Sequence, residues 1–213
     1  MILVEHATVI TVDGERRVFA DGSVLVDGSR ILQVGPSREV RPPRAPDRVI
    51  DGSRLVVTPG FVDTHVHLSE HLNRGLLLDD IPVDRYLPDW LIPLYAVMTA
   101  EDEQHAALLA GIEMIRTGTT TFCEAGTLFD TSAVADAVER LGMRAILGRW
   151  TWDLESGPDR MRQTTAEALA ATDHHRGRAG RLRSGGGASP RPGASRRAHD
   201  REPVAPPALT GPR

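Results

Sequence analysis

The hydrophobic rhythm of the chain changes near residue 55, and this change constrains the fold more than any other feature. Before it, residues 1–56 alternate short runs rich in Val, Ile and Leu with Asp-Gly pairs, at 13–14, 21–22, 27–28 and 51–52. Asp-Gly between apolar runs is typical of tight hairpin turns. We therefore predict a small antiparallel β-module over residues 1–56.

From residue 55 onward, strand-like runs alternate with longer helical periods. The expected strands are residues 55–64, 119–124 and 143–150. Two helical patterns separate them, and a third is expected around 159–171. Strands joined by helices run parallel, as in an α/β barrel or a doubly wound sheet. Because either architecture needs more strands, residues 57–172 are predicted to form an incomplete (β/α) barrel of the TIM type, its first three strand–helix units.

The two helical patterns carry their own start and stop signals. Thr99 followed by Asp102 forms a capping box, which opens the first helix. The expected apolar stripe and stop of that helix are Leu108, Ile112, Ile115 and Gly118. For the second helix they are Val134, Val138, Leu141 and Gly142.

The composition changes again after Thr172. Residues 173–213 contain nine Arg and three acidic residues, a charge of +6, so the −4 of the whole chain leaves −10 for residues 1–172. Their large aliphatic residues are only Leu182, Val204 and Leu209. Such a segment buries too little apolar surface to offset the entropy of ordering, and we predict that it is disordered. An arginine-rich tail can bind nucleic acid. We favour a different explanation of this composition, in which a GC-rich gene is translated out of frame from this point.

Two histidines stand one residue apart in PGFVDTHVHL, residues 59–68. Side chains of a strand alternate between faces, so His65 and His67 should point the same way and Val66 the opposite way. In a barrel, that position is near the carboxyl-terminal rim, where catalytic groups gather. The pair could bind one divalent metal ion, Zn²⁺ or Fe²⁺. The alternative is a chance His-x-His pair in a polar loop, which the preceding apolar run argues against.

The motif PGFVDTHVHL resembles the first-strand signature of the metal-dependent amidohydrolase superfamily. The β-module ending in VTPG resembles the small β-sandwich of that family. The stretch from HLNRGLLLDD to GTTTFCEAG resembles the branch with cytosine deaminase-like proteins and triazine chlorohydrolases. The resemblance covers residues 1 to about 172 and favours His65 and His67 as metal ligands.

The resemblance implies a mechanism and a larger ligand set. A metal-bound hydroxide would attack an electrophilic carbon that carries nitrogen or halogen, and a carboxylate would move the protons. The family's other ligands and acid–base groups, on later barrel strands, cannot be placed in this chain, so no catalytic residue is assigned. His174 and His175 lie in the arginine-rich tail without a strand pattern, and we do not expect them to be the missing ligands.

Other polar and aromatic residues near the expected pocket are weaker candidates, and substrate-binding residues stay unassigned. His71 and Arg74 could face a substrate, although exposed loop residues are more often solvated. Tyr86 and Trp90 could close a lid over a heterocyclic ring, or anchor a long loop. Glu124 ends the second strand and could point into the pocket, although a strand-terminal carboxylate is usually a cap or a surface group. His105, on a helix, is expected to be a surface or satisfied core residue, and Cys123 a small buried apolar residue.

These observations favour a cytoplasmic, metal-dependent hydrolase of non-peptide carbon–nitrogen bonds, a deaminase of a nucleobase-like or triazine-like ring. No run approaches the roughly 20 apolar residues that cross a bilayer, and the start of the chain lacks the apolar centre of a signal peptide. The expected partner is a small-molecule substrate, with neither membrane nor nucleic acid; a full-length parent could be a homo-oligomer. The alternative is a catalytically inactive, truncated and frameshifted fragment of an amidohydrolase.

Overall fold

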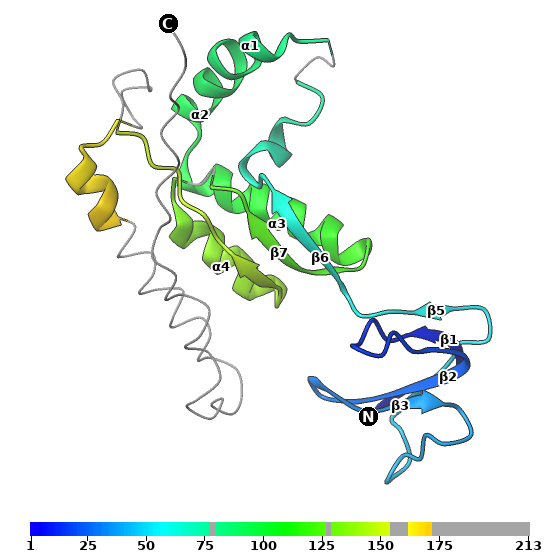
Figure 1. Ribbon diagram of the computed structural model, residues 1–213. Helices are drawn as coiled ribbons and strands as arrows, with labels where there is room; N and C mark the ends of the chain where they lie inside the picture. The colour runs from blue at the N-terminus through cyan, green and yellow to red at the C-terminus, as the bar shows by residue number, and fades with distance from the viewer. Residues whose placement is uncertain (77–79, 127–128, 154–161, 172–213) are drawn as a thin grey trace, which may run out of the picture. The chain divides into compact units, whose positions relative to one another are not determined.

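The computed structural model describes four stretches of the chain, residues 1–76, 80–126, 129–153 and 162–171 (Figure 1). The chain divides into two compact units, Met1–Gln163 and Thr164–Arg213. In the second unit residues 165–171 are helical, which agrees with the helix expected around 159–171. The predicted disordered tail, with His174 and His175, lies outside the described residues.

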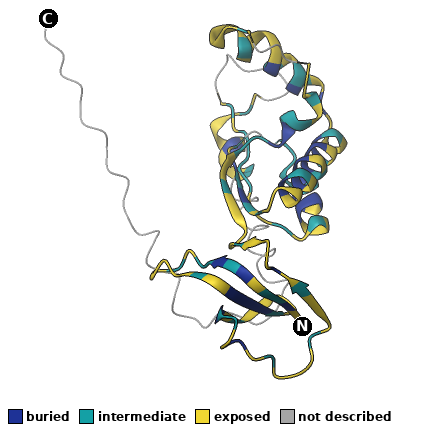
Figure 2. Ribbon diagram, turned by 90° about the vertical axis from the view of Figure 1, so that its right-hand side faces the viewer, coloured by how far each residue is buried: buried dark blue, intermediate teal, exposed yellow. Residues whose placement is uncertain are grey.

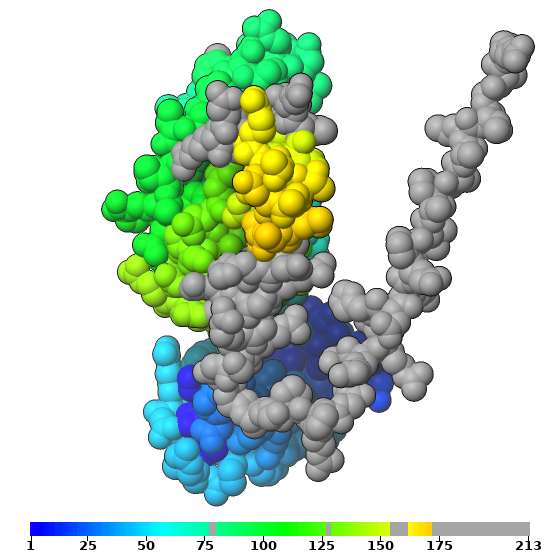
Figure 3. Space-filling view, turned by 90° about the vertical axis from the view of Figure 1, so that its left-hand side faces the viewer, coloured from blue at the N-terminus to red at the C-terminus, as the bar shows by residue number. Residues whose placement is uncertain are grey.

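The amino-terminal module is a five-stranded mixed sheet. Its strands are β1 (Ile2–Ile10), β2 (Val18–Asp27), β3 (Arg30–Pro36), β4 (Arg48–Asp51) and β5 (Val56–Val57). They follow the order β3-β2-β1-β4, and β5 also pairs with β1. In Figure 3 the residues of this module, coloured in shades of blue, pack against one another as a continuous body.

The prediction of an antiparallel module is correct for part of this sheet only. β1 pairs antiparallel with β2, and β2 with β3, but β4 and β5 both run parallel to β1. A two-residue hairpin cannot join parallel strands, so a longer connection must carry the chain back. Residues 37–47, which include the proline-rich stretch, provide that connection before β4.

One of the Asp-Gly pairs forms the expected hairpin turn and another does not. Asp27 pairs with Arg30 across the turn between β2 and β3, where Gly28 has a φ of 55°. The pair at 21–22 instead lies inside β2, where the register with β1 shifts. A Cβ on Gly22 would come within 2.8 Å of two neighbouring side chains, so this glycine permits close approach rather than a turn.

The second sheet consists of three parallel strands in the order of the sequence. They are β6 (Phe61–Val66), β7 (Thr119–Glu124) and β8 (Arg144–Ile146), and β7 lies between the other two. The expected strand at 119–124 is confirmed. The run at 55–64 is divided instead, because residues 58–60 separate β5 from β6. The third strand is shorter than residues 143–150.

Helices connect the parallel strands, as the alternating pattern predicts. After β6 come η1 (Ser69–Asn73), α1 (Val83–Tyr86), the π-helical turn η2 (Leu87–Leu91), α2 (Ile92–Val97) and α3 (Ala100–Arg116), and α4 (Thr131–Leu141) follows β7. The capping box of Thr99 and Asp102 is present at the start of α3. α4 ends at Gly142, in the left-handed conformation with a φ of 69°. Both boundaries are confirmed.

The predicted apolar face of α3 is correct at Leu108, which is partly buried against the core, and wrong at the two isoleucines. Ile112 and Ile115 are each 47% exposed. The buried face consists mainly of small residues, with buried positions at Glu103, Ala106, Ala107, Ala110, Gly111 and Met114 (Figure 2). A Cβ on Gly111 would lie 2.3 Å from Leu141 Cδ1 of α4. The close packing of α3 on α4 therefore selects small side chains, and Leu109, Ile112 and Ile115 lie exposed outside the contact.

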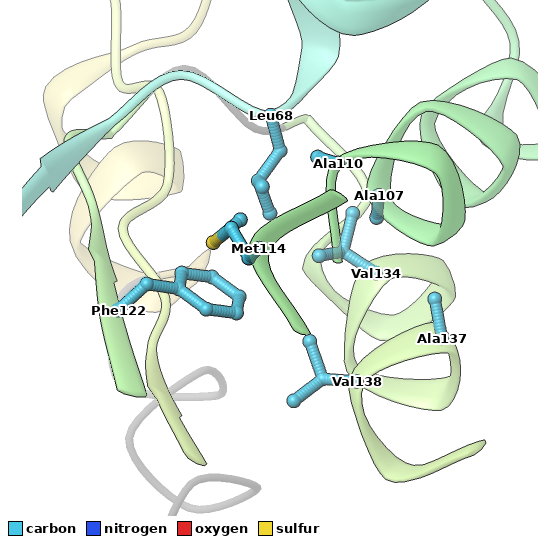
Figure 4. Packing of buried hydrophobic residues seen from close by; sticks show 8 residues of the cluster. All are labelled: Leu68, Ala107, Ala110, Met114, Phe122, Val134, Ala137 and Val138. Atoms are coloured by element: carbon cyan, nitrogen blue, oxygen red, sulfur yellow. The ribbon is translucent and has the colours of Figure 1, made fainter. Parts of the chain in front are cut away.

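One hydrophobic cluster joins the parallel strands to α3 and α4. Figure 4 shows Leu68, Met114 and Phe122 pointing toward one another. Its other buried members, from α3 and α4, are Ala107, Ala110, Val134, Ala137 and Val138. The cluster packs α3 and α4 against the sheet.

Among the described residues, no helix combines the length and the apolar character that crossing a bilayer requires.

Truncating Phe122 should strongly destabilise the chain. Its side chain is 2% exposed, so Phe122→Ala should lower the free energy of unfolding by about 3–5 kcal/mol, measured by urea denaturation. The matched control is Phe61→Ala on the neighbouring strand, because Phe61 is 58% exposed; it should lower that free energy by less than about 1 kcal/mol. Equal effects of the two substitutions would contradict the assignment of the core.

Candidate functional site

The two histidines of the His-x-His motif converge at the end of β6. His65 belongs to the strand and His67 follows it, and their Nε2 atoms are 3.2 Å apart. The ring planes are nearly perpendicular, at 87°. Val66, between them, packs against the core shared by α3 and α4. The expectation that both imidazoles lie on one face of the strand is therefore confirmed.

This geometry fits two ligands of one tetrahedral metal ion. Zinc–nitrogen bonds of 2.0–2.1 Å place two tetrahedral ligands roughly 3.3 Å apart. The separation of the two Nε2 atoms is close to that value. Without metal, the same distance permits a hydrogen bond in which one ring donates to the other. Across the described stretches of the chain, no group of three or more His, Cys, Asp and Glu side chains could hold a metal ion.

The other ring nitrogen of His67 is also notable. His67 Nδ1 is buried and has no hydrogen-bond partner among the residues that the structure describes. A metal-bound histidine usually donates its second ring N–H to a carboxylate, a carbonyl or water, which fixes the ring. The pair thus supplies two nitrogen donors, and its second shell is incomplete within the described residues.

The end of β7 lies beside the end of β6 and carries a buried carboxylate. Glu124 is paired in register with Val66, and its side chain is 2% exposed. Its Oε2 accepts a hydrogen bond of 2.7 Å from the backbone N–H of Gly126. Of the two roles expected for Glu124, the strand-terminal cap is confirmed, because the carboxylate accepts from the backbone of the turn after β7. The surface role is wrong, because the side chain is buried.

A second buried carboxylate, Glu103 of α3, holds two of the loops that follow the strands. Its Oε2 accepts from the N–H of Asp130 at 2.7 Å, and its Oε1 accepts from the N–H of Phe129 at 3.0 Å. Ser69 Oγ of η1 donates to the same Oε1 at 3.4 Å. Burial raises the pKa of Glu103, although these donors oppose the shift. Glu103 therefore fixes the turn after His67 and the loop before α4 to a single helix.

Aromatic side chains that follow β7 and β8 pack together around Tyr95 of α2. Tyr95 is fully buried, with its ring centroid 5.2 Å from that of Trp150 and 5.7 Å from that of Phe129. Trp150 stacks on Trp152 with centroids 5.6 Å apart. The segment from α1 to α2 is therefore tied to residues that follow β7 and β8.

The residues proposed as a lid are divided between two environments. Tyr86 packs at the edge of the aromatic cluster and donates a hydrogen bond to Glu70, so it anchors its segment. Trp90, in η2, is 39% exposed. An anchoring role is evident for Tyr86, and Trp90 keeps an accessible aromatic surface.

The remaining candidates have structural contacts or lie at the surface. Arg74 forms a bidentate pair with Glu113 of α3, at 2.7 and 2.6 Å. His71 Nδ1 lies 3.2 Å from the backbone oxygen of His67. His105 is exposed on α3, and Cys123 is a free thiol of intermediate burial. None of these four joins the histidine pair as a ligand.

The sequence interpretation missed Glu70, Tyr95 and Glu103. A signal for Glu103 was present, because it precedes Ala106, Ala107 and Ala110 at the spacing of one helical face. The contact between Glu70 and Tyr95 had no local signal, because 25 residues separate the two.

The raised pKa of Glu103 predicts a pH-dependent contribution to stability. The folded chain keeps the proton on this carboxyl to a higher pH than the unfolded chain does, in which the pKa of a glutamate is about 4.5. The contribution to stability is thus fully present below a pH of about 4.5 and is lost as the pH rises through the folded pKa. In urea unfolding at pH 4 to 8, the stability of wild type relative to Glu103→Gln should fall with rising pH.

The matched control is Glu101→Gln, an exposed position in the first turn of the same helix. Relative to this variant, the stability of wild type should stay flat over the same pH range. A wild-type advantage over Glu103→Gln that rises with pH would mean that the hydrogen bonds from Phe129 and Asp130 outweigh burial.

Comparisons with known proteins agree with this geometry. The family model for amidohydrolases matches residues 56–198, which is more than half of the chain. The match extends beyond Thr172, near which we expected the resemblance to end. A 5-methylthioadenosine/S-adenosylhomocysteine deaminase of Pelotomaculum thermopropionicum is 39% identical over 156 residues, 73% of this chain and 35% of that protein. The chain thus spans about a third of the length of this relative.

Solved structures show the same relationship. An adenosine deaminase of Xanthomonas campestris with bound zinc superposes with a TM-score of 0.70 at 29% identity, covering 86% of this chain and 39% of that one. An atrazine chlorohydrolase of Arthrobacter aurescens complexed with zinc has the same fold, with a TM-score of 0.68 at 24% identity over 80% of this chain and 41% of that one. With its paired histidines at the end of β6 and the family match over most of its length, the chain belongs to the amidohydrolase family.

Proposed function

We propose that this protein is a metal-dependent hydrolase of non-peptide carbon–nitrogen bonds, with His65 and His67 as two ligands of one divalent ion, Zn²⁺ or Fe²⁺. The observation that carries the proposal is the 3.2 Å separation of the two Nε2 atoms at the end of β6. Zinc in a solved relative favours Zn²⁺. When bound, such an ion supplies a water of lowered pKa for attack on a ring carbon.

The chain's own residues hold the two imidazoles in place. Val66 is packed into the core, so the residues on either side of it point away from that core. Glu103 holds the turn that follows His67 through Ser69. The ligand pair therefore lies between a packed strand and an anchored turn, and little reorganisation is needed to bind an ion.

The substrate we propose is a nucleobase-like ring that carries an amino group, as in a purine nucleoside. Hydrolytic deamination replaces the amino group with an oxygen from water and releases ammonia. The 39% identity to a methylthioadenosine/S-adenosylhomocysteine deaminase supports this choice over a triazine ring. The exposed face of Trp90 is suited to cover a flat ring and exclude water. We propose a cytoplasmic location for this reaction.

A second candidate is that the 213 residues by themselves bind metal weakly and do not turn over substrate. Catalytic zinc sites use three protein ligands and a water. In the part of the chain that the structure describes, His65 and His67 are not accompanied by a third ligand. Under this proposal the polypeptide is an inactive fragment of an amidohydrolase.

Zinc binding and ammonia release test the two candidates separately. Calorimetric titration of the 213-residue chain should give one Zn²⁺ per chain. His65→Ala and His67→Ala should each weaken binding at least about tenfold, because loss of a second-shell group alone weakens metal sites by 10–100-fold. The matched control, His105→Ala, removes an exposed histidine of α3 and should leave the affinity unchanged.

The two readouts have distinct consequences. Zinc affinity that survives both substitutions would refute the metal assignment. Ammonia release from 5-methylthioadenosine that requires Zn²⁺ and both histidines would support the hydrolase and overturn the inactive fragment. Zinc binding with ammonia at background would support the fragment.

A further inference from the structure

The carboxylate of Glu70 joins the turn after the histidine pair to a distant segment of the chain. Glu70 lies in η1, three residues after His67. Its Oε1 accepts a hydrogen bond of 2.7 Å from Tyr95 Oη, and its Oε2 accepts one of 3.2 Å from Tyr86 Oη. Both tyrosines belong to the segment from Val83 to Val97, which we name the cover segment. One side chain thus contacts this segment at its α1 and α2 ends.

Tyr95 is the point where the cover segment meets the strand ends. Its ring is fully buried and makes edge contacts with Phe129, after β7, and Trp150, after β8. A buried phenol requires an acceptor, because an unpaired hydroxyl in an apolar cluster costs roughly 1–3 kcal/mol. Glu70 supplies that acceptor, and a carboxylate gives a stronger hydrogen bond than a neutral oxygen does.

The protonation of Tyr95 is compatible with this arrangement. Burial, followed by the hydrogen bond to Glu70, raises the pKa of Tyr95 far above its usual range, so the phenol keeps its proton and donates it. Burial likewise raises the pKa of Tyr86. Both hydroxyls therefore act as donors to the carboxylate at neutral pH.

We propose that Glu70 is a positioning residue: through Tyr95 and Tyr86 it holds the cover segment, including Trp90, against the turn that follows His67. The importance of this contact for substrate rests on the proposed function, since the cover segment would close over the ring. The contact itself does not depend on metal or catalysis. Glu70 acts on the site through the two tyrosines and is not assigned a chemical step.

Hydrogen exchange of the 213-residue chain tests the proposal directly. Tyr95→Phe should speed amide exchange of residues 83–97 about fivefold to tenfold, as expected for loss of one strong hydrogen bond. Glu70→Ala removes the hydrogen bonds of both tyrosines and should speed it at least as much. Exchange in α3 and in the amino-terminal module should stay unchanged. Glu70→Gln keeps one acceptor oxygen and should have a smaller effect than Glu70→Ala.

A double-mutant cycle separates this contact from general destabilisation. If Glu70 and Tyr95 act through each other, Glu70→Ala combined with Tyr95→Phe should exchange no faster than Glu70→Ala alone. The matched control is Glu113→Gln, which removes a carboxylate paired with Arg74 at the end of η1 and should leave residues 83–97 unaffected. If the effects of the two single substitutions multiplied in the double variant, or if exchange became faster along the whole chain, the proposal would be overturned.

Two further measurements separate its failure from that of the proposed function. The near-ultraviolet circular dichroism of the stacked Trp150 and Trp152 should weaken in Glu70→Ala at temperatures where the chain stays folded. Zinc affinity should change less than about twofold, because the histidine pair lies at the end of β6 on either side of Val66, which packs against the core. A wild-type chain that fails to bind zinc would refute the proposed function but not the role of Glu70. An unchanged aromatic signal in Glu70→Ala would count against Glu70 as a positioning residue.

Discussion

The parallel pairing of β6, β7 and β8 is the constraint on which the site depends. Parallel strands place their carboxyl ends at one edge of a sheet, so the residues that follow them meet there. In this chain His67 and Trp150 follow β6 and β8, and Glu124 is the last residue of β7. Val66 pairs with Glu124, and the backbone oxygen of Val66 accepts from the N–H of Ala125. The histidine pair and the buried carboxylate of β7 are thus neighbours because of backbone hydrogen bonds.

Two carboxylates then determine how the loops are arranged at this edge. Glu103 reaches from α3 to Ser69 and to the backbone before α4, and Glu70 reaches from η1 to two tyrosines. Both accept hydrogen bonds from neutral donors. Such contacts are directional and become strong when buried, whereas apolar packing alone would permit several loop positions. The edge therefore combines an apolar core beneath the sheet with polar contacts between the loops.

Local features of the sequence were sufficient to predict much of the second sheet. The capping box at Thr99, the glycine stop at Gly142 and the strand at 119–124 depend on neighbouring residues, and they were located correctly. The shared face of His65 and His67 followed from the period of a strand. These features need no knowledge of distant contacts.

Tertiary packing explains what the sequence did not predict. The buried face of α3 is lined by small residues because α4 lies close to it, so Ile112 gave a misleading signal. β4 and β5 run parallel to β1, because the connections between strands, rather than the Asp-Gly pairs, set their direction. The contact of Glu70 with Tyr95 joins residues far apart in sequence, and nothing near either residue indicated it.

The most direct test of the central claim is to observe the histidine ring nitrogens by long-range ¹H–¹⁵N NMR while Zn²⁺ is added. The geometry predicts that Nε2 of both His65 and His67 moves to the chemical shift of a metal-bound nitrogen at one equivalent, since these are the atoms that converge. The rings of His71 and His105 should keep their shifts. Binding through only one ring of the pair, or through another histidine, would contradict the account.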